Sequence, residues 1–246
     1  MHGSSVLKGL LGLGFVAAVA SVASCAVDDR QLRSLSNAGA GSSAGANALG
    51  GGAGDDSVAQ TPLPDCDYSG GVLGGCETLV ANPGFAQDTE GWKAEDATVA
   101  MSWNADNATD DGDSGSLSVV NSLYGAADGI ASRAAAQCLP TKSGRTYGFA
   151  LDVFIPEGQG EGLDGGGYRA SAGLSVIFFT SKHCDQFTLA SATSDLLEDD
   201  GQWAHREGRA VAPQGAESML VRLVTFKNFQ EFNFEARFDN VLLRAE

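Results

Sequence analysis

The sequence has little positive charge for its length. Its 246 residues include 15 Lys and Arg against 31 Asp and Glu, so the formal net charge is -16 at pH 7. Such a chain repels nucleic-acid phosphates and anionic lipid headgroups, and no basic patch with interleaved aromatics offsets this repulsion. We therefore expect no nucleic-acid partner and no docking onto a lipid surface. The carboxylates either maintain solubility or include ligands for a cation.

Side chains and motifs typical of catalysis are also scarce. Of three histidines, His2 lies in the leader, and neither His183 nor His205 belongs to an HExxH or similar zinc motif. The sequence has neither a G-x-S-x-G nucleophile elbow nor a GxGxxG motif between a strand and a helix, and it has no P-loop lysine. Acidic runs such as residues 198–200 are more typical of solvated loops than of a glycosidase pair. We expect a protein that is not an enzyme, with a hydrolase as a distant alternative.

An apolar run occupies residues 9–23 and ends in Val22-Ala23-Ser24-Cys25. It is too short to span a bilayer comfortably and polar sequence follows it, which is typical of a signal peptide covering residues 1–24. The small residues before Cys25 resemble the lipobox of bacterial lipoproteins. That resemblance implies that Cys25 is acylated and anchors the chain, and the lack of Asp directly after it implies the outer membrane. The alternative is ordinary secretion, with cleavage after Ala26 and no lipid.

The segment after Cys25 is poor in large apolar side chains. Residues 36–64 are mostly Ala, Gly, Ser and Asn, which cannot bury enough surface to offset their ordering entropy. We expect residues 25–64 to comprise the lipidated cysteine and a flexible linker, in which the roughly thirty residues 36–64 have a reach of about 30 Å. We expect residues 65–246 to form one domain.

Four cysteines remain once Cys25 is set aside as the lipid site: Cys66, Cys76, Cys138 and Cys184. An even set in an exported protein predicts two disulfides. Cys66 and Cys76 flank a short glycine-rich loop and are expected to close it, while Cys138 could pair with Cys184. Other pairings stay open, because four cysteines allow three connectivities.

Strand patterns dominate the domain. Large apolar residues alternate with small or polar ones in residues 99–103, 146–155, 174–178, 219–223 and 232–238. Turn signals separate these stretches, which predicts an all-β fold, an antiparallel β-sandwich. The apolar phase shifts from Phe238 to Val241, so we expect a bulge or bend near Asp239 and Asn240.

An ordered set of motifs spans about residues 77–246. It comprises Asn82-Pro83-Gly84-Phe85 with Gly91-Trp92, Gly115-Ser116-Leu117, Gly144-Arg145-Thr146-Tyr147, Gly201-Gln202-Trp203, Ala212-Pro213-Gln214-Gly215-Ala216 and Phe238-Asp239-Asn240-Val241. The set resembles the carbohydrate-binding modules with a galactose-binding-like jelly roll. The resemblance implies that fold and a non-catalytic role in binding carbohydrate, and it is more specific for the fold than for the function.

The same resemblance implies a structural calcium site. In such modules an acid after the opening Phe and the Asp of the closing motif often hold the ion together with backbone carbonyls. Asp239 retains the closing position, but Ala86 stands where the first acid is expected, and Gln87 follows it. Gln87 or carbonyls could complete the six to eight oxygen ligands of calcium. The alternative is that Asp239 makes hydrogen bonds at the bulge.

Aromatic side chains are the expected sugar contacts, because an apolar ring stacks on the C–H face of a pyranose. Tyr124 and Tyr168 lie in polar or glycine-rich surroundings and are the best candidates for exposure. Trp103 is a further candidate, although its phase also fits the core. Asn121 could bond to sugar hydroxyls or be an ordinary loop residue.

Other residues have weaker assignments. Trp92 and Trp203 are expected to pack inside the sandwich, and Asn228 and Gln230 are either sugar contacts or solvated loop residues. The favoured hypothesis is a monomeric domain of a surface-anchored lipoprotein that binds a glycan. The alternative is a structural or adhesion lipoprotein of the cell envelope that binds protein partners.

Overall fold

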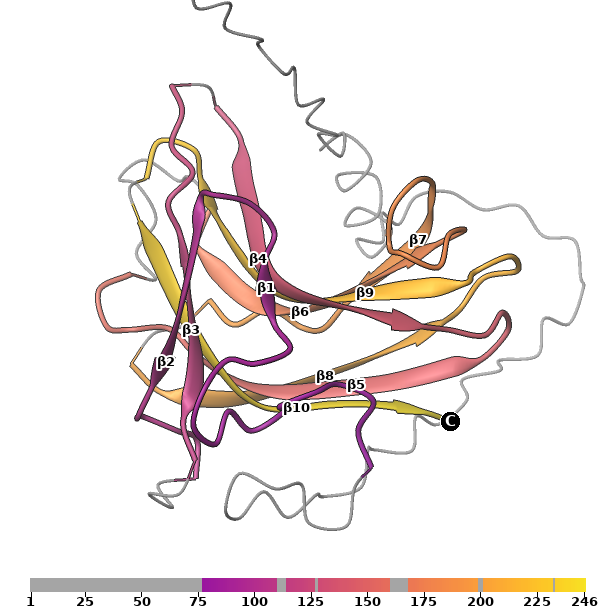
Figure 1. The fold of residues 1–246 in the computed structure, drawn as a ribbon. Coiled ribbons are helices and arrows are strands. Elements are labelled where there is room, and N and C mark those ends of the chain that lie inside the picture. Colours follow the sequence, from indigo (N-terminus) through magenta and orange to yellow (C-terminus); the bar gives the residue numbers. More distant parts are fainter. Residues whose placement is uncertain (1–76, 110–113, 127, 160–167, 199–200, 232) are drawn as a thin grey trace, which may run out of the picture. The chain divides into compact units, whose positions relative to one another are not determined.

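The computed structural model describes residues 77–109, 114–126, 128–159, 168–198, 201–231 and 233–246 (Figure 1). The signal peptide, Cys25, the linker 25–64 and the pair Cys66 and Cys76 lie outside these residues and stay predictions. In the described part of the chain, no helix is both long and apolar enough to cross a bilayer.

The described residues form two antiparallel sheets of five strands each. One sheet has the order β1-β4-β9-β6-β7 and is called the β9 sheet; the other has the order β2-β3-β10-β5-β8 and is called the β10 sheet. The strands are β1 (Lys93–Ala94), β2 (Val99–Asn104), β3 (Ser116–Asn121), β4 (Ile130–Pro140), β5 (Thr146–Phe154), β6 (Ser171–Phe179), β7 (Thr188–Thr193), β8 (Trp203–Val211), β9 (Ser218–Asn228) and β10 (Phe234–Ala245). This arrangement confirms the all-β, antiparallel β-sandwich of jelly-roll type.

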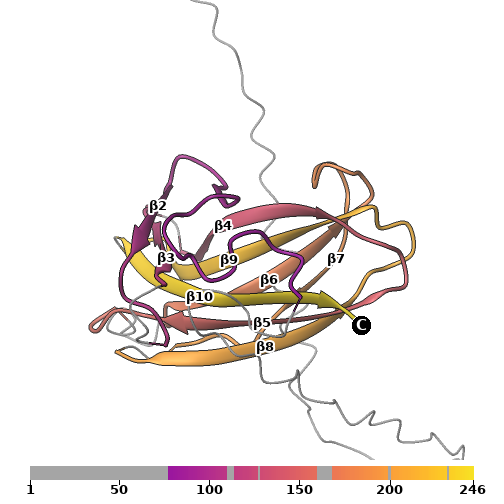
Figure 2. The ribbon, with the colours of Figure 1, turned by 60° about the horizontal axis from the view of Figure 1, so that its bottom comes forward.

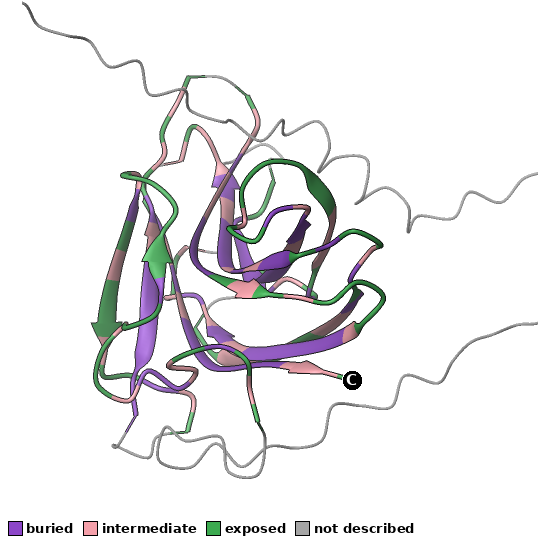
Figure 3. Cartoon of the chain, turned by 45° about the vertical axis from the view of Figure 1, so that its right-hand side comes forward, coloured by how far each residue is buried: buried purple, intermediate pink, exposed green. Residues whose placement is uncertain are grey.

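The core lies between the two sheets, where the predicted period-two patterns place their apolar residues. Figure 2 shows β10, β5 and β8 in one layer and β4, β9 and β6 in the other. Phe149 and Leu151 of β5 face Phe178 of β6 and Leu223 of β9 in one cluster of buried residues. Figure 3 shows the central strands as largely buried. Each fully buried side chain of this size contributes about 1.5–3 kcal/mol to folding.

The predicted bulge is present in β10 and is confirmed. Pairing between β10 and β5 shifts register between Asp239 and Leu242, and Asn240 has a positive φ of 51°. The apolar phase changes at the same place, so that Phe238 and Val241 both face the core. Figure 1 shows β10 running beside β3 first and then turning along β5.

The opening and closing motifs pack against each other. The N–H of Val241 donates to the carbonyl of Pro83 at 2.8 Å, and the N–H of Leu243 donates to Oγ1 of Thr78 at 3.0 Å. Phe85 is fully buried, and its ring centroid lies 6.0 Å from that of Trp92. Backbone groups beyond the β10 bulge therefore obtain partners from the first described segment.

A disulfide joins Cys138 in β4 to Cys184 in the loop between β6 and β7, which confirms that predicted pairing. The bond closes a sequence separation of 46 residues. By restricting the unfolded chain, such a link typically contributes about 2–4 kcal/mol.

Gly208 of β8 provides the test of core packing. It pairs with Phe149, and a Cβ at this position would lie 2.4 Å from Cε2 of the Phe149 ring. We expect Gly208→Ala to lower the free energy of unfolding by about 1–3 kcal/mol, because the buried ring must shift. Denaturant unfolding measures the change.

Gly125→Ala is the matched control, because a Cβ there makes only an ordinary 3.6 Å contact with Phe229. The double variant Gly208→Ala, Phe149→Leu should lose less free energy of unfolding than the sum of the two single losses, because the smaller side chain leaves room for the added Cβ. Equal stability of the two glycine variants would contradict this account of the core.

Candidate functional site

Two exposed tyrosines lie on loops at one end of the sandwich. Tyr124 is 59 % exposed in the β3–β4 loop, and Tyr168 is 48 % exposed in the segment before β6. Strand pairing brings these loops to the same end, because β3 ends opposite the start of β10, β4 starts opposite the end of β9, and β6 also starts beside it. We call this region the tyrosine end: the described parts of residues 122–129, 168–170 and 228–233. The expected exposure of both tyrosines is observed.

Hydrogen bonds connect the loops of the tyrosine end. The N–H of Gly125 donates to the carbonyl of Phe229 at 3.0 Å, and the N–H of Phe229 donates to the carbonyl of Gly129 at 3.1 Å. Nδ2 of Asn228 donates to the carbonyl of Tyr168 at 2.8 Å. These bonds link the chain beside each tyrosine to the β9–β10 turn, so the two rings are presented from a connected framework.

The polar side chains of this end are used within the framework. Nδ2 of Asn228 also donates to Oε1 of Glu231 at 2.9 Å, and Nε2 of Gln230 donates to Oδ1 of Asp128 at 3.0 Å. Gln230 is exposed and borders solvent, whereas Asn228 is half-buried. The structure thus places both predicted hydrogen-bonding residues beside the tyrosines, with Asn228 as a link between loops.

Asn121 has a different place from the one expected. It is fully buried, its Nδ2 donates to the carbonyl of Ala131 at 3.1 Å, and its Oδ1 accepts the N–H of Leu123. The expectation that it contacts a ligand is therefore corrected: its amide joins β3 to β4 beneath the loops. The sequence did not show that this last residue of β3 faces inward.

Trp103 is exposed but does not join the tyrosine end. It is 40 % exposed and pairs with Leu117, at the end of β3 opposite to the loop that carries Tyr124. Its Nε1 donates to the carbonyl of Phe85 at 2.7 Å, and its ring covers Gly115, where a Cβ would lie 2.4 Å from Nε1. The indole therefore links β2 to the opening motif.

The other two tryptophans differ from each other. Trp92 is buried in the core, as predicted. Trp203 is only half-buried and lies outside the core cluster, so the prediction for it is wrong. It pairs with Phe154 on the outer face of the β10 sheet, with ring centroids 5.4 Å apart, and the guanidinium of Arg237 lies 5.5 Å from the Phe154 centroid. Side chains alternate between the two faces of a strand, and Val153 faces inward, so Phe154 and its partner Trp203 face outward.

The predicted calcium ligands lie in different environments. Asp239 is fully buried, and its carboxylate accepts the N–H groups of Ala108 at 3.0 Å and Asn240 at 2.7 Å. Gln87 is exposed. Within the described residues, no group of three or more His, Cys, Asp or Glu side chains is placed to hold a metal ion. N–H groups directed at both oxygens of Asp239 fit the hydrogen-bonding role better than a calcium site, and calcium stays a prediction.

His205 forms an ion pair on the outer face of the β10 sheet. Its Nδ1 lies 2.9 Å from Oδ1 of Asp152, whose Oδ2 accepts a hydrogen bond from Nδ2 of Asn240. The hydrogen bond to Asp152 raises the pKa of His205 above its ordinary value, and partial burial opposes the rise. Glu207 also raises this pKa, while Arg206 lowers it.

The comparisons assign no family to the chain. No family model matches the chain, and no curated protein matches it. Among similar solved structures, the enzymatically active domain of tailspike protein 4 of bacteriophage CBA120 has 13 % identity and a TM-score of 0.48, covering 69 % of this chain. The CBM22-1-GH10 modules of xylanase 10B from Clostridium thermocellum have 14 % identity and a TM-score of 0.49, covering 70 %.

A third similar structure is the CBM22-1 xylan-binding domain of Paenibacillus barcinonensis Xyn10C. It has 15 % identity and a TM-score of 0.44, and the alignment covers 66 % of this chain and 90 % of that one. The chain spans only 21 % and 29 % of the first two proteins. The solved structures similar to the chain thus include carbohydrate-binding modules, and a likeness at this level assigns no function.

The His205–Asp152 pair predicts a specific pH dependence. Because the pKa of His205 is raised in the folded state, its stabilisation is complete below the unfolded value of 6.5 and is lost as the pH rises through the folded pKa. Asp152→Asn should bring the His205 pKa back toward 6.5, and NMR titration of the imidazole signals measures it. An unchanged His205 curve in the variant would contradict the pairing.

Proposed function

We propose that the domain binds carbohydrate at the tyrosine end and catalyses no reaction. The observation that carries this proposal is the presence of two exposed tyrosines on loops that hydrogen bonds join to one turn. Because these hydrogen bonds already order the loop backbone, a sugar that stacks on the rings orders less of the chain on binding. The ordered motifs that resemble carbohydrate-binding modules support the same class of ligand.

The chemistry of the surrounding side chains also suits a neutral, hydroxyl-rich ligand. Gln230 and Asp128 lie at the rim, and amide and carboxylate groups exchange hydrogen bonds with sugar hydroxyls. The carboxylates of Asp128 and Glu231 are matched in number by the cations Arg169 and Lys227 at the same end, and a surface without a strong net charge suits a neutral ligand. Both carboxylates accept hydrogen bonds from neighbouring amides, which supports a binding role over proton transfer.

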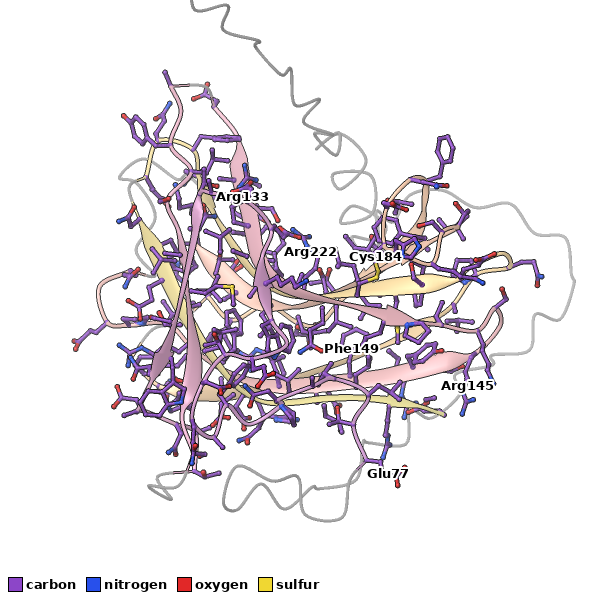
Figure 4. All side chains as sticks on the ribbon, in the orientation of Figure 1. Glu77, Arg133, Arg145, Phe149, Cys184 and Arg222 are labelled. Atoms are coloured by element: carbon purple, nitrogen blue, oxygen red, sulfur yellow. A yellow bond between two sulfur atoms is a disulfide. The ribbon has the colours of Figure 1, made fainter. Side chains whose placement is uncertain are left out.

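The alternative is a structural or adhesion protein that binds a protein partner. One observation favours it: Phe187 is 78 % exposed and Leu189 is 38 % exposed, both beside the loop that the Cys138–Cys184 disulfide fixes. Figure 4 labels Cys184 in this region, near β7. Because β6 starts at the tyrosine end and runs away from it to this loop, the two surfaces can be tested separately.

Alanine substitution separates the two functions. The domain from Asp65 to Glu246, produced under oxidising conditions, is screened on a glycan array. We expect Tyr124→Ala and Tyr168→Ala each to weaken retention by at least about tenfold, the equivalent of about 1.4 kcal/mol of lost stacking. Phe187→Ala is the matched control, an exposed aromatic at the far end of β6, and should bind as the unsubstituted domain does.

Two results would reject the carbohydrate proposal. One is silence across the array from a folded domain with its disulfide formed. The other is unchanged retention by both tyrosine variants. If only Phe187→Ala lost retention, the binding surface would be assigned to the β6–β7 loop.

We further propose that Cys25 is acylated and anchors the domain in the outer membrane of the cell envelope. The lipobox-like sequence before Cys25 supports this. The full chain, expressed in a bacterial host and labelled with radioactive palmitate, should carry the label in the membrane fraction, whereas Cys25→Ser should be unlabelled. Label on the Cys25→Ser chain would show that another residue carries the lipid. A parent chain that is unlabelled and released would show ordinary secretion.

A further inference from the structure

A buried lysine lies beneath the tyrosine end. Met219, Val221 and Leu223 of β9 face the core, and Thr225 and Lys227 continue the same phase toward the end of the strand. Lys227 is fully buried. A lysine is almost never buried so completely unless its charge is paired or solvated by the protein.

The ammonium group of Lys227 is solvated by backbone carbonyls. Its Nζ donates to the carbonyl of Leu123 at 2.5 Å, to that of Glu231 at 2.7 Å and to that of Asn228 at 3.2 Å. An ammonium has three N–H donors, so three acceptors satisfy it completely. Burial lowers the pKa of Lys227, and the nearby Glu231 carboxylate opposes the shift.

The three carbonyls belong to the loops that present the tyrosines. Leu123 precedes Tyr124 in the β3–β4 loop. Asn228 donates to the carbonyl of Tyr168 and, through its N–H and its side chain, to the carboxylate of Glu231. One buried cation is therefore bonded to the chain next to Tyr124 and to the residue that holds the chain at Tyr168.

We propose that Lys227 is a positioning residue: its ammonium is a tethered cation in a carbonyl cage that holds the loops of the tyrosine end in their presenting arrangement. A cage of this kind binds the charge and the N–H donors of the ammonium group, and it does not require a covalent link between that group and the backbone. A free alkylammonium ion should therefore replace the side chain when Lys227 is shortened. The link to carbohydrate binding rests on the proposed function, whereas the cage itself does not.

Chemical rescue tests the cage. In Lys227→Ala, we expect the amides of Gly125 and Phe229, which bond across the loops, to exchange hydrogen roughly ten- to a hundredfold faster, because three carbonyls lose a buried partner. Added n-propylammonium, which replaces the deleted atoms, should restore slow exchange. Equimolar 1-propanol, similar in shape but uncharged, and tetramethylammonium, charged but without N–H donors, are the controls.

The pattern of exchange separates positioning from general stability. Amides of the central strand β5 should keep their protection in Lys227→Ala under native conditions, whereas a purely structural role would speed exchange of both sets together. Rescue by propanol, or no rescue by propylammonium, would overturn the carbonyl cage. Glycan retention on the array should fall in Lys227→Ala and recover with propylammonium, in parallel with the exchange protection of the loop amides.

A measurement on the unsubstituted protein covers the case in which Lys227→Ala does not fold. The Nζ-bound protons of Lys227 should give a slowly exchanging NMR signal with scalar couplings to the three carbonyl carbons. Fast exchange of these protons would overturn the proposal. If the parent domain binds no glycan while the NMR signal and the rescue hold, the proposed function fails and the positioning role stands.

Discussion

The burial of one apolar face from each of two five-stranded sheets is the constraint on which the rest of the molecule depends. It selects which residue of every strand faces inward, and it leaves so little space that Gly208 must lack a side chain where Phe149 crosses it. The same constraint explains the bulge in β10. The strand serves two different neighbours, β3 and β5, and the extra residue turns it while both halves keep their apolar side chains inside.

At the tyrosine end the core changes from apolar to polar. Asn121, Thr225 and Lys227 occupy inward positions, and each bonds to backbone groups of neighbouring strands or loops. Because a buried polar group is costly without a partner, the loops must adopt the arrangement that supplies the acceptors. The hydrogen bonds that the buried polar side chains require therefore also set the arrangement of the exposed loops. This connects the polar end of the core to the surface for which we propose a function.

Much of the fold could be predicted, because the alternation of apolar and polar residues along a strand is visible in the sequence. The strands rich in large apolar residues and the phase shift in β10 were predicted in this way. The Cys138–Cys184 pair was one of several pairings that the cysteine count left open, and the structure selects it. The site was accessible only in part. Tyr124 and Tyr168 stood out by their polar surroundings, but nothing local distinguished the inward-facing Asn121 or the outward-facing Trp203 from the opposite assignments. Lys227 continues the period-two phase of Met219, Val221 and Leu223, but a lysine is normally exposed, so the phase alone did not mark it as buried.

The sequence by itself determined the class of fold, because alternating apolar residues and regular turns have few solutions other than two packed antiparallel sheets. It also marked the two tyrosines as candidates for exposure. Only the tertiary structure decided that these tyrosines share one end of the sandwich while Trp103 lies at the other end of β3. The same holds for the ammonium of Lys227, whose partners come from residues 123, 228 and 231. Such groupings depend on strand pairing between distant segments, and pairing is a property of the whole fold.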